Sequence, residues 1–139
     1  MNLIPGMAIS ASGLTAEKLR LDIIANNLAN IETTRTQEGG PYRRQMPVFE
    51  ERLREEIEMG FKGYGVKVAR IERDSSAPRR VYNPDHPDAG EDGYVSMPNI
   101  DIVDEMIDMI TATRAYEANV TAFNASKSMA LKALEIGRG

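Results

Sequence analysis

The residues best suited to chemistry lie in the middle of the chain, in the run Asp85-His86-Pro87-Asp88. One imidazole and two carboxylates could help to bind a metal, but this set needs further donors from distant parts of the chain. Proline, asparagine, aspartate and glycine crowd the same stretch, and these residue types favour turns. We therefore interpret the run as a rigid turn whose polar side chains bond the local backbone. A small metal-dependent enzyme centred on His86 is the alternative.

A second charged group lies in residues 48–59, where five glutamates alternate with Arg52 and Arg54. Paired carboxylates can serve acid–base catalysis, but Glu50 and Arg54 have the i, i+4 spacing of an ordinary surface pair on a helix. We expect this segment to be a short helix or an extended arm. The sequence has no cysteine, one histidine, and no phosphate loop, nucleophile elbow or zinc-protease motif.

These absences predict a protein that is not an enzyme, with no catalytic residue, no cofactor, no metal site and no small-molecule substrate. The formal net charge is −4. Because nucleic-acid binding needs a basic surface to neutralise phosphates, we expect no nucleic-acid partner.

The positions of the helix breakers divide the chain into three parts. Two windows, residues 14–38 and 99–136, contain none of the 7 prolines and 11 glycines. We expect a first helix over about residues 9–31, with Pro5 able to sit in a first turn. We expect a longer helix through the last window, capped by Asn99 or Asp101 and stopped at Gly137.

Between the two helices the sequence predicts a small β-rich insert. The β-like segments are 65–71, 81–82 and 94–95, separated by glycines and prolines. The expected fold is mainly α, with the N- and C-terminal helices pairing as a coiled-coil-like unit. The expected parts are an N-terminal axial helix region (1–34), a middle insert (35–98) and a C-terminal axial helix (99–139).

Both helices carry apolar residues at the 3–4 spacing of a coiled-coil seam. We predict that the seam residues of the two helices pack against each other. In the first helix they are Leu14, Leu21, Ile24, Leu28 and Ile31, and in the last helix Ile102, Met106, Met109, Tyr116, Val120 and Phe123. A helix through the last window would be roughly 54 Å long. A compact domain of this size is only about 37 Å across, so the helix either breaks or lies in an assembly.

Asparagines flank the expected seams. In the first helix they are Asn26, Asn27 and Asn30, and in the last helix Asn119 and Asn124, with Arg114 nearby. Amides beside a coiled-coil seam can fix register between helices or subunits. The alternative for the first group is a frayed helix end that runs into a loop. A ridge of alanines at 115, 118, 122 and 125 would also allow close helix approach.

The residues at the two ends resemble those of the flagellar axial proteins of rod and hook. The N-terminal resemblance runs through Ser12-Gly13-Leu14-Thr15-Ala16 and Ala25-Asn26-Asn27-Leu28-Ala29-Asn30. The C-terminal resemblance runs through Glu105-Met106-Ile107-Asp108-Met109-Ile110 and Arg114-Ala115-Tyr116-Glu117-Ala118-Asn119-Val120. The run Gly39-Gly40-Pro41-Tyr42-Arg43-Arg44 resembles the proximal-rod subtype.

This resemblance implies a structural subunit that polymerises helically into the proximal rod, a shaft that carries motor torque to the hook. It implies as partners the rod proteins B, F and G, the hook–basal-body protein at the rod base and the flagellar type III export apparatus. It implies a rod that crosses the periplasm, with export that needs no cleavable signal peptide. A monomeric helical adapter that binds one partner helix is the alternative function.

Overall fold

Two long helices at the ends of the chain dominate the structure, a computed structural model that describes residues 3–52 and 63–139. Helix α1 spans Leu3–Ala29 and helix α2 spans Ile102–Gly137. The side chain of Asp101 caps α2 by accepting hydrogen bonds from the backbone N–H groups of Val103 (2.8 Å) and Asp104 (3.3 Å). This satisfies donors that a helix start leaves without intrahelical partners.

The C-terminal end of α2 differs slightly from the sequence prediction. The sequence predicts that the helix stops at Gly137, whereas this glycine is itself the last helical residue. The capping residue is Arg138, which has an ordinary right-handed conformation (φ −94°, ψ −11°).

The segment between the helices forms two antiparallel two-stranded sheets. Strand β1 (Gln45–Glu51) pairs with β2 (Val66–Arg73), and β3 (Arg79–Tyr82) pairs with β4 (Tyr94–Met97). The prediction of a mainly α fold with a small β insert is therefore confirmed. Residues 48–51 are strand rather than helix, and Glu50 faces Lys67 across the hairpin at 3.4 Å. Residues 53–59 of the expected arm lie outside the described residues.

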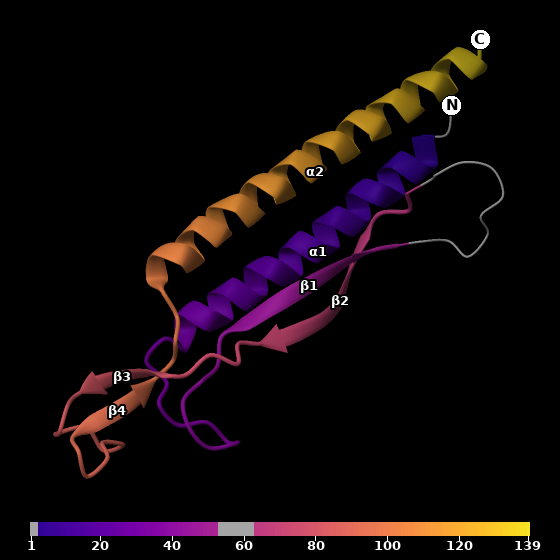
Figure 1. The fold of residues 1–139 in the computed structure, drawn as a ribbon. Helices are drawn as coiled ribbons and strands as arrows, with labels where there is room; N and C mark the ends of the chain where they lie inside the picture. Colours follow the sequence, from indigo (N-terminus) through magenta and orange to yellow (C-terminus); the bar gives the residue numbers. More distant parts are fainter. Residues whose placement is uncertain (1–2, 53–62) are drawn as a thin grey trace.

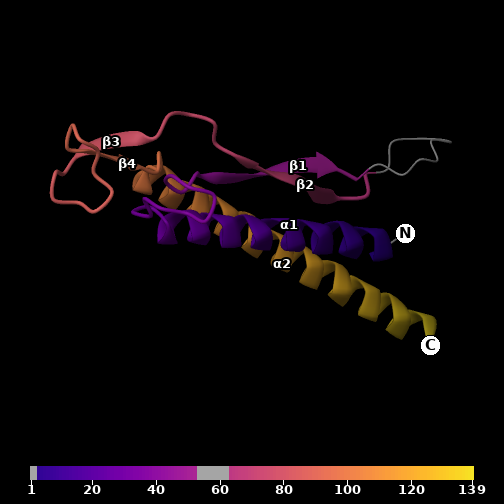
Figure 2. The same cartoon turned by 90° about the horizontal axis from the view of Figure 1, so that it is seen from below.

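In Figure 1 helix α1 lies between α2 and the β1–β2 hairpin, and Figure 2 shows that α2 crosses α1 at an angle. The β3–β4 ribbon lies beyond the end of this three-layered body, near the start of α2 (Figure 1). Because the hairpin covers one side of α1 and α2 covers another, α1 buries more than one face.

The two helices run antiparallel with a regular seven-residue register. The contacting pairs are Gly6 with Ser126, Gly13 with Asn119, and Asn27 with Glu105. Each step of seven residues along α1 corresponds to a step of seven back along α2, which is the heptad spacing of a coiled coil. Ala112, which is 0% exposed, lies on the same line of α2 and falls opposite Arg20 in this register.

The buried line of α1 is offset by one residue from the predicted seam. Its buried apolar residues are Ala16, Ile23 and Ile24. Of the predicted seam residues in α1, only Ile24 is fully buried. Leu14, Leu21 and Leu28 are half-buried, as is Ile31, which follows the helix. Small and polar residues, rather than leucines, occupy the line of closest helix contact.

The chain exposes far more surface than a compact protein of its mass. Its accessible surface area is 10247 Å². A compact monomer of this mass would expose about 7,200 Å². The excess, about 3,000 Å² by the same scaling, fits a thin, elongated body in which, among the described residues, α1 covers one face of α2.

Candidate functional site

The amide of Asn27 joins α1 to the hairpin and to α2. Its Oδ1 accepts hydrogen bonds from the Gln45 backbone N–H (2.9 Å) and the Tyr42 hydroxyl (3.0 Å). Its Nδ2 donates to the Gln45 carbonyl (2.9 Å) and to Glu105 Oε2 (3.3 Å). The side chain thus pairs with Gln45 as a neighbouring strand would, and all four of its hydrogen-bonding positions are used. Asn27 is 1% exposed.

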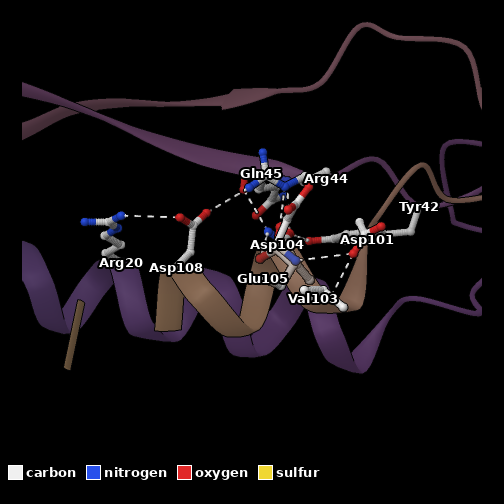
Figure 3. Close-up of polar contacts among 10 residues, drawn as sticks. Arg20, Tyr42, Arg44, Gln45, Asp101, Val103, Asp104, Glu105 and Asp108 are labelled. Atoms are coloured by element: carbon white, nitrogen blue, oxygen red, sulfur yellow. Dashed lines mark hydrogen bonds and ion pairs between the residues drawn. The ribbon is translucent and has the colours of Figure 1, made fainter. Parts of the chain in front are cut away.

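Glu105, which accepts from this amide, belongs to a line of ion pairs that continues through Arg44 and Asp108 to Arg20 (Figure 3). The guanidinium of Arg44 donates from Nε to Glu105 Oε1 and from Nη2 to Asp108 Oδ2 (3.2 Å). Asp108 also faces Arg20 of α1, at 3.7 Å. Glu105 is 0% exposed, and a buried carboxylate requires both a counter-charge and hydrogen bonds, which Arg44 and Asn27 supply. We call Arg20, Asn27, Arg44, Glu105 and Asp108 the polar junction.

Tyr42 borders the polar junction through its hydroxyl group. Its hydroxyl donates to Asn27 and accepts from Asn26 Nδ2 (3.2 Å). Burial raises the pKa of the Tyr42 phenol, and the negative charge of Glu105 raises this pKa further, while Arg73 lowers it. The neutral phenol is therefore the favoured form in the folded chain.

The predicted subtype motif leads directly into the polar junction. Gly39 and Gly40 have positive φ angles (85° and 74°), which glycine adopts without strain. They form a tight loop in which Thr36 N–H bonds the Gly40 carbonyl at 3.0 Å. The loop turns the chain through Pro41 so that Tyr42 and Arg44 reach the helices. Arg43 points elsewhere, to the Asp74 carbonyl (3.3 Å).

The other predicted polar residues occupy different surroundings. Asn30 bonds back to the Asn26 carbonyl (2.9 Å) and accepts from the Thr33 hydroxyl (3.1 Å), so it closes the end of α1. Asn119 donates to the Ala115 carbonyl (2.9 Å) and packs on Gly13. Arg114 and Asn124 are exposed on α2. Their role between subunits stays a prediction.

The predicted seam of α2 is only partly covered. Met109, Tyr116, Val120 and Phe123 are half-buried. Ile102 and Met106, by contrast, are 50% and 54% exposed, because Glu105 occupies the inward position of that turn. The alanine ridge also faces largely outward: 118, 122 and 125 are exposed and 115 is half-buried, and Ala112 provides the close approach instead.

The turn that contains His86 is held by local contacts. His86 Nδ1 accepts a hydrogen bond from the Asp88 backbone N–H (3.0 Å), as the turn interpretation predicts. Asp88 accepts from the Thr34 hydroxyl (2.7 Å) and from Arg35. The hydrogen bond from Thr34 is the main cause that lowers the pKa of the Asp88 carboxyl. Burial opposes this effect, and the hydrogen bond and positive charge of Arg35 lower the pKa further. Within residues 3–52 and 63–139, no group of three or more histidines and acids is placed to hold a metal ion.

None of the helices in the described parts of the chain is both long and apolar enough to span a membrane. The polar junction pairs two cations with two anions and satisfies all four hydrogen-bonding positions of the Asn27 amide. It therefore offers a structural contact rather than a free acid, base or nucleophile.

Sequence reasoning missed Glu105, Asp108 and Arg20 as members of this junction, and it missed the backbone of Gln45 as the partner of Asn27. The available signal was the heptad spacing of Glu105, Ala112, Asn119 and Ser126 on α2. A search for apolar periodicity passes over such a line, because its members are small or polar.

Comparisons with known proteins show which family the chain resembles. The family "Flagella basal body rod protein" matches residues 7–36, and "Flagellar basal body rod FlgEFG protein C-terminal" matches residues 91–136. The chain is 45% identical to the flagellar basal-body rod protein FlgC of Borreliella burgdorferi, over 100% of both chains. It is 44% identical to FlgC of Bacillus subtilis and 40% identical to FlgC of Escherichia coli O157:H7, each over 99% of this chain and 100% of the relative.

Proposed function

The chain belongs to the family of the flagellar basal-body rod protein FlgC, and from this premise we propose that its terminal helices are the surfaces through which it assembles. Its function is that of a structural subunit of the rod of the flagellar basal body. The finer proposal is that it polymerises helically within the proximal rod, in the shaft that carries motor torque to the hook.

The observation that carries this proposal is the large uncovered surface of the single chain. The chain exposes 10247 Å², about 3,000 Å² more than a compact monomer of its mass. A standard protein interface buries about 800 Å² per partner. The excess is therefore enough for several neighbours. A head-to-tail contact whose rotation does not close generates a helical filament, which is the geometry that a rod requires.

The three parts of the chain have different proposed tasks. Residues 1–34 and 99–139 form the helical tube with their neighbours, and residues 35–98 lie outside it and select which neighbours fit. The exposed polar residues Arg114 and Asn124 make contacts between subunits. The polar junction keeps the helix pair and the insert in a fixed relation, so that torque applied to one part is passed to the other.

The proposed partners follow from membership of the family. They are the rod proteins B, F and G, the hook–basal-body protein at the rod base and the flagellar type III export apparatus. The assembled rod would cross the periplasm. We propose no catalytic activity, which agrees with the fully paired charges of the polar junction.

Gene deletion with complementation tests the proposal. The deletion strain should be non-motile and should lack complete basal bodies, and the intact gene should restore both. An epitope-tagged chain should co-purify with basal bodies. A motile deletion strain, or a functional tagged chain that is absent from purified rods, would contradict the assignment. A soluble one-to-one complex with a single partner would instead support the adapter alternative.

A further inference from the structure

An apolar strip on α2 faces away from α1. We use "apolar strip" for five residues at the start of the helix: Ile102, Val103, Met106, Ile107 and Ile110. Each is at least 50% exposed. Their spacing places them on one face, opposite the face of Glu105 and Ala112. Exposed apolar groups gathered in this way mark a surface that another molecule covers.

Acidic residues border the apolar strip on one side. Asp74, Asp101, Asp104 and Asp108 line a shallow groove together with Ile107 and Arg44. Arg44 is already bonded to Glu105 and Asp108. Asp101 and Asp104 are exposed, so they give this border a negative charge. An occupant of the strip should therefore combine apolar and basic groups.

The C-terminal end of α2 has this chemistry. In the seven-residue register of the two helices, the first described residue of α1 lies opposite residue 129 of α2. The described part of α1 therefore does not cover α2 beyond residue 129. The end of α2 also diverges from α1 (Figure 2). Leu131 and Leu134 are 53% and 66% exposed there. Lys127 and Arg138 lie on the same helix face as the two leucines, because the four positions are successively four, three and four residues apart. We call residues 130–138 the overhang.

We propose that the overhang of one copy docks on the apolar strip of the next copy, with Arg138 and the adjacent Lys127 toward Asp101 and Asp104. The contact rests on the proposed rod function and identifies one interface within it. The strip and the two-leucine overhang are each about 12 Å long at the rise of an α-helix. They differ in sign of charge, so a strip does not attract a strip. Such a contact is head-to-tail and leaves a free strip and a free overhang on each pair.

Engineered disulfides test this contact directly, because the chain has no native cysteine. The variant Ile107→Cys/Leu134→Cys carries one cysteine in the strip and one in the overhang. The two positions lie about 40 Å apart along α2, so they cannot bridge within one chain. Oxidation of cells with assembled basal bodies should give dimers and larger covalent multimers of the chain. Each single variant should remain monomeric.

A charge exchange supplies the matched test. Asp104→Lys should reduce cross-linking at least about tenfold, as loss of about 1.4 kcal/mol of binding energy would. Cross-linking should return when Lys127→Glu and Arg138→Glu are added. Thr121→Lys, on an exposed part of α2 away from the strip, should leave it unchanged.

Three results would overturn the proposal: no multimer of the double-cysteine variant, a dimer of Ile107→Cys alone, or an adduct with a different basal-body protein only. The incorporation of each variant into purified basal bodies is measured in parallel. Normal incorporation without multimers refutes this interface and leaves the rod function standing. Absence of the unmodified chain from basal bodies refutes the rod function itself.

Discussion

At Asn27, one amide satisfies backbone groups of the hairpin and a carboxylate of α2 simultaneously. Replacing it by alanine leaves the Gln45 N–H and C=O and the Glu105 carboxylate short of partners in a buried space. Because a buried polar group without a partner is costly, Asn27→Ala should lower the free energy of unfolding by about 3 kcal/mol. Urea unfolding followed by circular dichroism measures this change.

The neighbouring Asn26 is the matched control. From an exposed position its side chain donates one hydrogen bond to the Tyr42 hydroxyl and accepts one from Asn30 Nδ2. Asn26→Ala should therefore lower the free energy of unfolding by only about 0.5 kcal/mol. Equal losses for the two variants would show that burial of the Asn27 amide is not what stabilises the polar junction.

The phenol of Tyr42 should titrate at a higher pH than an ordinary tyrosine. Burial first and the charge of Glu105 second raise its pKa above the ordinary value of 10.0. A pKa that is raised on folding gives stability that is present below the unfolded pKa and is lost as pH rises through the folded pKa. Absorbance at 295 nm should therefore show a late component among the 5 tyrosines.

Two variants identify that late component. Tyr42→Phe should remove it, and Tyr82→Phe, which alters an exposed tyrosine in the β3–β4 ribbon, should leave it in place. A late component that survives in Tyr42→Phe would contradict the assignment to the polar junction.

At the scale of the helix pair, two glycines of α1 allow opposite predictions. A Cβ at position 13 would lie 2.7 Å from Asn119 Oδ1, whereas a Cβ at position 6 would meet Ser126 Oγ at an ordinary 3.8 Å. Alanine favours a helix over glycine by about 1 kcal/mol. Gly6→Ala should therefore raise the free energy of unfolding by up to about 1 kcal/mol. Gly13→Ala should lower it by about 2 kcal/mol through overpacking.

The double variant Gly13→Ala/Asn119→Ala checks the cause in the same urea experiment. Removing the Asn119 amide makes room for the new methyl group, so most of the lost stability should return. A double variant as unstable as Gly13→Ala would mean that the clash is not the reason.

These same helices explain which parts of the fold could be predicted from the sequence. The breaker-free windows, the cap at Asp101 and the β-like runs depend on local propensity, so both helices and strands β2, β3 and β4 could be predicted. Strand β1 was not among the predicted strands, since its segment is rich in charged residues that also suit a helix. Which residues of α1 point toward α2 could not be predicted, because the hairpin covers one side of α1 and α2 covers another. The strongest apolar spacing ran through Leu14, Leu21 and Leu28, while the closest contact uses Gly13 and Asn27.

The polar junction could not be predicted from the sequence for a related reason. Asn27, Arg44 and Glu105 come from three separate segments, and their meeting depends on the turn at Gly39 and Gly40 and on the helix register. Each residue alone has an ordinary surface interpretation. Only the three-dimensional arrangement shows that the amide is completed by the Gln45 backbone and that Arg44 neutralises a fully buried carboxylate.

For the whole molecule, the large exposed surface implies that stability and assembly use different parts of α2. Described contacts with α1 reach position 126 on α2, where Ser126 lies against Gly6. Residues 130–139 lie beyond this line. A chain that stops after Met129 should therefore keep its urea midpoint, with a change in the free energy of unfolding below about 0.5 kcal/mol, as for surface changes.

The same truncation should abolish motility and incorporation into basal bodies, because it removes the exposed leucines of the overhang. A chain that stops after Asn119 is the control, since it also loses the half-buried Val120 and Phe123 and the contact of Ser126 with Gly6. It should lose both stability and assembly. A chain ending at Met129 that is folded and still supports swimming would show that the subunit assembles without the overhang. One that unfolds would show that the last turns of α2 stabilise the single subunit rather than its contacts.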